Sequence, residues 1–394
     1  MKKEQKRYYF DYAATTPVDK RVLKAMKPYF SDNFANPSSI HTPGMDASEA
    51  VESSRKIIAN YLGATPSEIF FTSSATESNN WALKGIAATA KGDKKKIIIS
   101  PIEHHCVLNT AKYLKKMGFE IVETPVDKEG IVDVEKLKEL VDDKTLLVSI
   151  MHSNNEMGTI EPIKEIGKIC DDKNVTFHTD AVQSYGKMPL NVNEMNVDLL
   201  TASSHKIYGP KGTAILYIRG GTQIEALLHG GGQESDKRSS TLNVPGIVGF
   251  RKATEICVKE MKKEWKKQSK LRDKITKYIK EKIPNSHLNG PALGKPRLCN
   301  NVNVRFDFIE GESLLMDLDS HGIAVSTSSA CSSPKLEASH VLTALGISKG
   351  DAHGTIRITI GRFTSEKDVK YFLTTLEKSV TKLRVMSPLN TRNC

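Results

Sequence analysis

The 394-residue sequence has no apolar run that approaches the roughly 20 residues needed to cross a bilayer. Its first residues are basic but lead into aromatic and polar residues instead of an apolar core, which argues against a secretory signal. Cysteine is scarce: the six residues are scattered, with no CxxC pair and no zinc spacing. In a chain of this length that pattern favours free thiols in a reducing compartment over a disulfide framework. We therefore expect a cytoplasmic protein with no membrane contact.

The sequence also lacks a module that combines aromatic and basic residues as nucleic-acid-binding folds do. Its formal net charge at pH 7 is nevertheless +11, and much of the excess lies in residues 94–96 and 259–282. These runs indicate either a solvated helix face or attraction to an acidic partner protein or tRNA. We expect no direct nucleic-acid binding.

Short apolar runs alternate with helical patterns in the first part of the chain. The patterns predict strands at 68–72, 96–100, 118–124 and 146–151, and helices at 19–30, 46–62 and 134–141. Such alternation is typical of an α/β fold with a mostly parallel sheet, in which ligands bind at the carboxyl ends of the strands.

The later part of the chain predicts a different organisation. Residues 248–282 indicate one long charged helix that links two domains. Strands near 301–306 and 355–359, with helices near 313–320 and 367–383, then predict a smaller α+β domain. Two or three domains are expected for this length.

A lysine lies in a compact turn after a short apolar strand, in the stretch TASSHKIYGPKG at residues 201–212. A desolvated lysine amine such as that of Lys206 is partly neutral and can form a Schiff base with a carbonyl compound. An exposed loop lysine is the ordinary alternative. A second stretch, VTFHTDAVQS at 175–184, reads as a strand that ends in Asp180. A carboxylate that keeps a pyridine nitrogen protonated, paired with a lysine that holds the cofactor, is what pyridoxal phosphate (PLP) chemistry needs.

The motifs HTDAVQS and SSHKIYGPKG together resemble the cofactor signature of cysteine desulfurases of the IscS/NifS kind. These proteins are a class V aminotransferase-like branch of the fold-type I PLP enzymes, and the resemblance extends from Phe10 to about Pro388. It implies a large PLP-binding domain at 16–258 with a seven-stranded, mostly parallel sheet, and a smaller C-terminal α+β domain at 259–394. It also implies that residues 1–15 pack near the active site and the small domain.

The resemblance assigns a set of cofactor-binding residues. The stretch that contains Ser74 and Glu77 fits a capping box at a helix start, which is either an ordinary cap or a phosphate cradle. The resemblance favours the cradle and implies that PLP, bound covalently to Lys206, is held by Ala75, Thr76, His104, Asn155, Asp180, Gln183, Ser203, His205 and Thr241.

Some of these residues carry more specific expectations. The ring of His104 is expected to stack on the cofactor and shuttle protons; a metal site at His104–Cys106 is not expected, because neighbouring side chains point apart. Thr241 is expected to reach the phosphate in the neighbouring subunit, which implies a homodimer. The family usually has glycine where this chain has Ser240, and that change is expected to restrict the turn.

A substrate carboxylate needs a cationic clamp. In residues 356–360 the isoleucines share one face, so Arg357 points to the other. A guanidinium held on a strand suits a bidentate carboxylate contact, although a surface arginine on an edge strand is the alternative. The resemblance makes Arg357, with Asn155, the substrate-binding residue, and leaves Arg362 as the second candidate.

Residues 324–336 are small and polar, the composition of a mobile loop that exposes Cys331 to chemistry. The stretch is similar to the family's SGSAC loop, with Ser328 in place of the usual glycine. The resemblance implies that L-cysteine is converted to L-alanine with a persulfide left on Cys331. An acceptor protein would then take the sulfur for iron–sulfur cluster assembly or for tRNA or cofactor thiolation.

Two alternatives remain open. A selenocysteine lyase or another class V PLP enzyme, such as an aminotransferase, would share much of this site, although an aminotransferase has no need of Cys331. A non-catalytic sulfur carrier or binding scaffold could keep the fold, but Lys206 and Asp180 argue against that interpretation.

Overall fold

Seven strands form the sheet that carries the larger part of the chain in the computed structural model, which describes residues 6–327 and 338–387. In the order across the sheet they are Ile69–Thr72 (β2), Ala214–Ile218 (β8), Leu199–Ser203 (β7), Thr176–Asp180 (β6), Thr145–Ser149 (β5), Lys96–Ile99 (β3) and Glu120–Glu123 (β4). The strands from β7 through β6, β5 and β3 to β4 run parallel, and β8 runs antiparallel to both its neighbours. The predicted α/β architecture with a mostly parallel sheet is confirmed.

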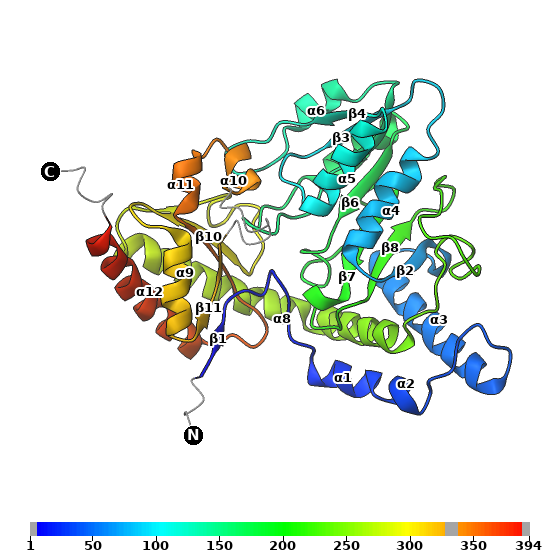
Figure 1. Cartoon of the computed structure of the whole chain (residues 1–394), viewed down its shortest axis with the longest axis horizontal. Helices are drawn as coiled ribbons and strands as arrows, with labels where there is room; N and C mark the ends of the chain where they lie inside the picture. Colours follow the sequence, from blue (N-terminus) through cyan, green and yellow to red (C-terminus); the bar gives the residue numbers. More distant parts are fainter. Residues whose placement is uncertain (1–5, 328–337, 388–394) are drawn as a thin grey trace.

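Helices cover both faces of this sheet, which is why strands such as β3, β5 and β8 are apolar runs and not alternating ones. In β3 the side chains of Ile97 and Ile99 belong to a core shared with one helix layer, and Ile98 belongs to the core on the other face. The first layer contains Ala75–Ala87 (α4) and His105–Lys116 (α5), and the second contains Thr42–Leu62 (α3) and Ile163–Asp172 (α7). Each buried isoleucine contributes about 1.5–3 kcal/mol by leaving water. Figure 1 shows α4 and α5 side by side on one face of the sheet.

A single helix joins the two parts of the molecule. Helix α8 (Val244–Lys282) contributes residues up to Cys257 to the large-domain core and residues from Leu271 onward to a second core. Figure 1 shows it crossing from the larger part to the smaller one. The lysines of its central stretch are exposed.

The smaller part is an antiparallel sheet in the order β12-β13-β10-β9, with helices packed against it. Its strands are Ser286–Leu288 (β9), Asn301–Phe306 (β10), Ser326–Thr327 (β12) and Thr355–Thr359 (β13), and its helices are Gly311–Ser320 (α9), His340–Ala344 (α10), Lys349–His353 (α11) and Glu366–Met386 (α12).

The N-terminal segment starts in the smaller part and then crosses to the larger one. Strand β1 (Tyr8–Tyr9) pairs in parallel with β11 (Ile323–Ala324), and Phe10 packs in the small-domain core. The chain then passes the carboxyl edge of the large sheet and reaches α1 (Lys20–Met26), as Figure 1 shows. Residues 11–16 therefore lie between the two domains.

Several predicted boundaries differ from the structure. The helix expected at 19–30 is two helices, α1 and α2 (Pro28–Ser31), because Pro28 has no N–H with which to continue the first. Helix α8 begins at Val244, four residues early, where the Asn243 side chain accepts from Gly246 N at 3.1 Å. The loop expected from residue 324 is in strands through Thr327; Ser328 and Cys331 lie outside the described residues.

Within the described ranges, no helix is long and apolar enough to span a bilayer.

Candidate active site

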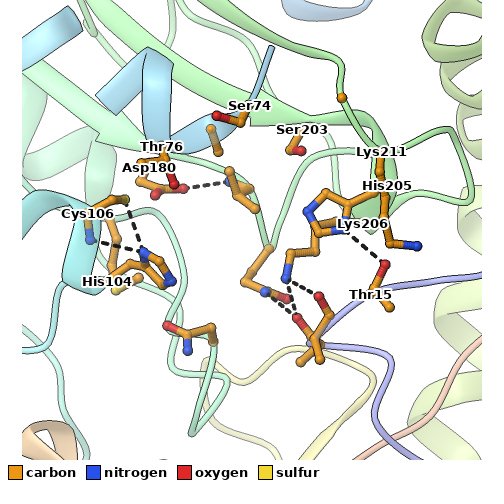
Figure 2. A pocket seen from close by; sticks show the side chains of 18 of the residues that line it. Thr15, Ser74, Thr76, His104, Cys106, Asp180, Ser203, His205, Lys206 and Lys211 are labelled. Atoms are coloured by element: carbon orange, nitrogen blue, oxygen red, sulfur yellow. Dashed lines mark hydrogen bonds between the residues drawn. The ribbon is translucent and has the colours of Figure 1, made fainter. Parts of the chain in front are cut away.

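A cavity of about 480 Å³ opens at the carboxyl edge of the parallel strands, against the N-terminal segment and β13. Most of the predicted site residues meet there, from elements far apart in the sequence. Those that line the cavity are Ala75, Thr76, His104, Asn155, Asp180, Gln183, Ser203, His205, Lys206 and Arg357. Figure 2 shows Asp180 and His104 on one side and Lys206 and His205 on the other.

Lys206 ends a 3-10 turn, Ser204–Lys206, that follows β7 directly. Its Nζ donates to the carbonyl oxygens of Ala13 at 2.5 Å and Ala14 at 2.8 Å. Gln183 Nε2 donates to the same Ala13 oxygen at 3.1 Å. The N-terminal segment thus holds the amine inside the cavity, a contact that no local sequence pattern predicts.

Asp180 is the last residue of β6 and is 5% exposed. Its Oδ2 accepts from Asn79 Nδ2 at 2.7 Å, and its Oδ1 accepts from Val182 N at 2.9 Å. These two contacts fix the carboxylate at the cavity wall, where it suits a cationic ring nitrogen. Asn79 was not predicted; its place one turn into α4, facing the sheet, is the signal that could have found it.

Another part of the cavity wall is suited to an anion. The start of α4 presents free N–H groups, and Thr76, Ser203 and the unpredicted Lys211 surround it. Burial, with the charges of Lys206, Lys211 and Lys187, lowers the pKa of His205 to about 4, so its ring is neutral at neutral pH.

The predicted capping box at the start of α4 is only half formed. Ser74 Oγ accepts from Glu77 N at 3.1 Å, as expected of an N-cap. The Glu77 carboxylate, however, accepts from Ser73 N at 2.9 Å and from Arg238 Nε at 2.7 Å. The glycine-rich loop that carries Arg238 is thereby tied to the anion-binding end of the cavity.

His104 is the N-cap of α5 and faces the cavity. Its Nδ1 accepts from Cys106 N at 3.2 Å and lies 3.0 Å from Cys106 Sγ. Burial is the largest cause of the lowered pKa of His104, and nearby Lys206 lowers it further. Because the backbone N–H occupies Nδ1, we assign the proton of the neutral ring to Nε2.

Cys106, beside this histidine, lines the cavity but was not predicted as a site residue. Burial raises the pKa of its thiol to about 12, so it remains protonated. Among the described residues, no group of three or more histidine, cysteine, aspartate or glutamate side chains is placed to hold a metal ion.

Arg357 lies on β13 and is 3% exposed. Its Nη2 donates to Asp11 Oδ1 at 2.9 Å and its Nη1 to Asn155 O at 3.2 Å, while its buried Nε has no hydrogen-bond partner among the described residues. The alternative candidate, Arg362, is not among the residues that line the cavity and pairs with Asp19 and Glu264.

One predicted residue that the structure describes, Thr241, is not brought to this cavity. Thr241 is exposed and does not line it, and the preceding Ser240 has a φ of 143°, in the region that favours glycine. Cys331 lies outside the described residues. The roles assigned to both stay predictions.

A covered parallel sheet with a lysine, a buried carboxylate and a helix N-terminus around one cavity defines a PLP-type α/β enzyme. The model of the aminotransferase class-V family matches residues 8–372, and the chain belongs to that family. Proteins of this family with the IscS name are PLP-dependent enzymes.

The chain is similar to named relatives over nearly its whole length. It is 50% identical over 380 residues to cysteine desulfurase IscS of Dictyoglomus turgidum, covering 96% of each chain. It is also 50% identical over 386 residues to cysteine desulfurase IscS of Methanosarcina thermophila, covering 98% of this chain and 95% of the relative.

Solved structures have the same fold. A NifS-like protein matches with a TM-score of 0.90 at 44% identity, and the match covers 96% of this chain and 100% of the NifS-like chain. The apo cysteine desulfurase from Thermococcus onnurineus matches with a TM-score of 0.86 at 28% identity, covering 95% of both chains.

Proposed function

We propose that the protein is a PLP-dependent cysteine desulfurase that converts L-cysteine to L-alanine and leaves the sulfur as a persulfide on Cys331. The observation that carries this proposal is the single cavity in which Lys206, Asp180 and Arg357 meet. The similarity to proteins named cysteine desulfurase IscS supports the choice of substrate.

The cavity fits PLP. Asp180 would face the ring nitrogen, and Gln183 would contact the ring oxygen. The start of α4 with Thr76, Ser203 and His205 would hold the phosphate. When bound, the cofactor supplies a carbonyl that condenses with amines and a ring that withdraws electrons from the substrate Cα.

The protein's own groups then orient the substrate. Arg357 lines the cavity and has a buried Nε–H without a partner among the described residues, a donor that suits a carboxylate oxygen. Asn155 lies in the same wall. The Lys206 amine would accept a proton, and His104, with its proton at Nε2, would donate one. The N-terminal segment holds the Lys206 amine through the carbonyl oxygens of Ala13 and Ala14.

The sulfur step falls to Cys331. Its thiolate would attack the substrate sulfur, so that an S–S bond forms while the substrate C–S bond breaks and its electron pair returns to carbon. A proton then completes alanine. The net change, cysteine plus thiol to alanine plus persulfide, balances without an added oxidant or reductant.

The finer assignments belong to the same proposal. Large apolar side chains are exposed in the connection between α2 and α3, with Phe34 at 73% and Ile40 at 94%. They support a homodimer, as does an exposed Thr241 available to a neighbouring site. The four described cysteines are free thiols, which supports a cytoplasmic location. The sulfur acceptor is proposed to be an iron–sulfur scaffold or a tRNA-thiolation enzyme.

The test uses ³⁵S-labelled cysteine and the purified, PLP-loaded protein. We expect alanine in solution and label on the wild-type chain, released by reductant, and neither product in Cys331→Ala. Cys170→Ala, at a buried cysteine away from the cavity, is the matched control and should behave as wild type. Full turnover by Cys331→Ala would favour a lyase or an aminotransferase instead. Lys206→Ala should lose the borohydride-trappable cofactor bond, and failure of the wild type to bind PLP would support a non-catalytic scaffold.

A further inference from the structure

The guanidinium of Arg357 has two partners that hold its outer edge. Nη2 donates to the Asp11 carboxylate at 2.9 Å, and Nη1 donates to the backbone oxygen of Asn155 at 3.2 Å. Another carboxylate, Glu156, is near, but its Oε2 accepts from Ser339 Oγ at 2.6 Å. Asp11 is therefore the side chain that pairs with Arg357 among the described residues.

Asp11 is itself fixed by backbone contacts on both sides. It forms a parallel bridge with Thr359 on β13, and Thr359 N donates to Phe10 O at 2.7 Å. Ala13 N donates to Thr359 Oγ1 at 2.9 Å. Since Thr359 and Arg357 are two residues apart on one strand, they share a face. The bridge thus places the Asp11 carboxylate beside the guanidinium by backbone register.

One edge of the guanidinium remains for a ligand. The Nε of Arg357 has no hydrogen-bond partner among the described residues, and its side chain is 4% exposed. A buried donor without a partner is costly, so this edge is suited to an incoming carboxylate. The guanidinium of a long arginine side chain keeps one orientation only when its other N–H groups are held by hydrogen bonds.

We propose that Asp11 is a positioning residue that holds Arg357 in the orientation in which it receives the substrate carboxylate. This inference rests on the proposed function. Asp11 also belongs to the segment whose Ala13 and Ala14 carbonyls accept from Lys206, so one stretch of chain positions both the carboxylate clamp and the cofactor lysine.

Asp11 could also act as a competitor for Arg357, and its removal would then change carboxylate affinity in the opposite direction. If its carboxylate merely competed with the substrate for Arg357, its removal would tighten carboxylate binding. If it positions Arg357, its removal weakens binding because the fork loses its orientation. The direction of the change in affinity therefore separates the two.

The experiment titrates PLP-loaded protein with L-alanine and with ethylamine, its analogue without a carboxylate, and follows the cofactor absorbance. In Asp11→Ala we expect affinity for L-alanine to fall at least about tenfold, with affinity for ethylamine unchanged. Asp11→Asn keeps an oxygen acceptor and should fall less. In an Arg357→Ala background, Asp11→Ala should cause no further loss. Asp93→Ala, at an exposed aspartate, is the matched charge control.

Unchanged or tighter L-alanine binding by Asp11→Ala overturns the inference, as does an equal loss for ethylamine or a further loss in the Arg357→Ala background. If Asp11→Ala does not fold, Asp11→Asn alone decides, with a loss confined to L-alanine as the supporting result and no loss as the contrary one. Alanine formation from cysteine by the wild type is measured first. If the wild type forms no alanine, the proposed function is contradicted. If the wild type turns over normally but Asp11→Ala binds L-alanine as the wild type does, only this inference is contradicted.

Discussion

Gly209 closes the turn that presents Lys206, and we expect its replacement by alanine to disturb that turn. A Cβ at this position would lie 2.0 Å from Ser204 Oγ, 3.0 Å from Ser204 O and 3.2 Å from Ala253 Cβ. Ser204 is fully buried, so its hydroxyl has no open space into which to move. The backbone oxygen is held by the turn and cannot yield without shifting Lys206.

The size of the effect follows from the cost of overpacking, typically about 1–3 kcal/mol. We expect Gly209→Ala to lower the free energy of unfolding by about that amount, measured by denaturant unfolding of the protein without added PLP. Because Ser204 and Lys206 share one 3-10 turn, we also expect weaker PLP binding, measured by titration of the cofactor absorbance.

A second substitution tests the stated cause. Ser204 Oγ has no hydrogen-bond partner among the described residues, so Ser204→Ala alone should change stability little. In the double variant it removes the 2.0 Å contact and should restore part of the loss, while the 3.0 Å contact with the backbone oxygen remains. Gly220→Ala is the control, since its nearest atom would be 3.7 Å away. If Gly209→Ala is as stable as Gly220→Ala, or Ser204→Ala restores nothing, the reasoning is refuted.

Three further predictions concern the clamp, the sheet and the loop. Arg357→Ala should raise the KM for cysteine about tenfold or more with a smaller change in kcat; an unchanged KM would contradict the role given to Arg357. Burial lowers the pKa of His178 to about 3, below its ordinary value of 6.5. Below pH 6.5 the ring therefore takes up a proton in the unfolded state but not in the folded one. The free energy of unfolding should accordingly fall by about 3 kcal/mol as the pH drops from above 6.5 to 4. Denaturant midpoints across that range should fall more steeply for the wild type than for His178→Asn, and parallel curves would be the contrary result. Arg238→Ala leaves the Glu77 carboxylate without its cationic partner near the proposed phosphate site, so PLP affinity should drop about tenfold in an absorbance titration. Equal affinity would show that this ion pair does not contribute to cofactor binding.

Much of the fold could be predicted from local patterns. The apolar runs of β3 and β5 and the capping residues at the start of α4 are signals from residues that are neighbours in the sequence. Such local signals predict where an element lies and whether it is a helix or a strand. Boundaries failed where one side chain or backbone group decided the end of an element. Pro28 divides a helix, and the Asn243 side chain starts α8 earlier than its apolar pattern indicates.

The sequence by itself determined the chemistry of the cavity, because Asp180 ends one strand and Lys206 follows another, each within a long and specific motif. The resemblance favoured Arg357 over Arg362, but only the tertiary structure shows that Arg357 is the one that lines that cavity. Arg357 and Arg362 are five residues apart, yet one pairs with Asp11 beside the cavity and the other with Asp19 and Glu264 away from it. These partners come from distant parts of the chain, and sheet register and domain packing bring them together; neither is encoded in a local pattern.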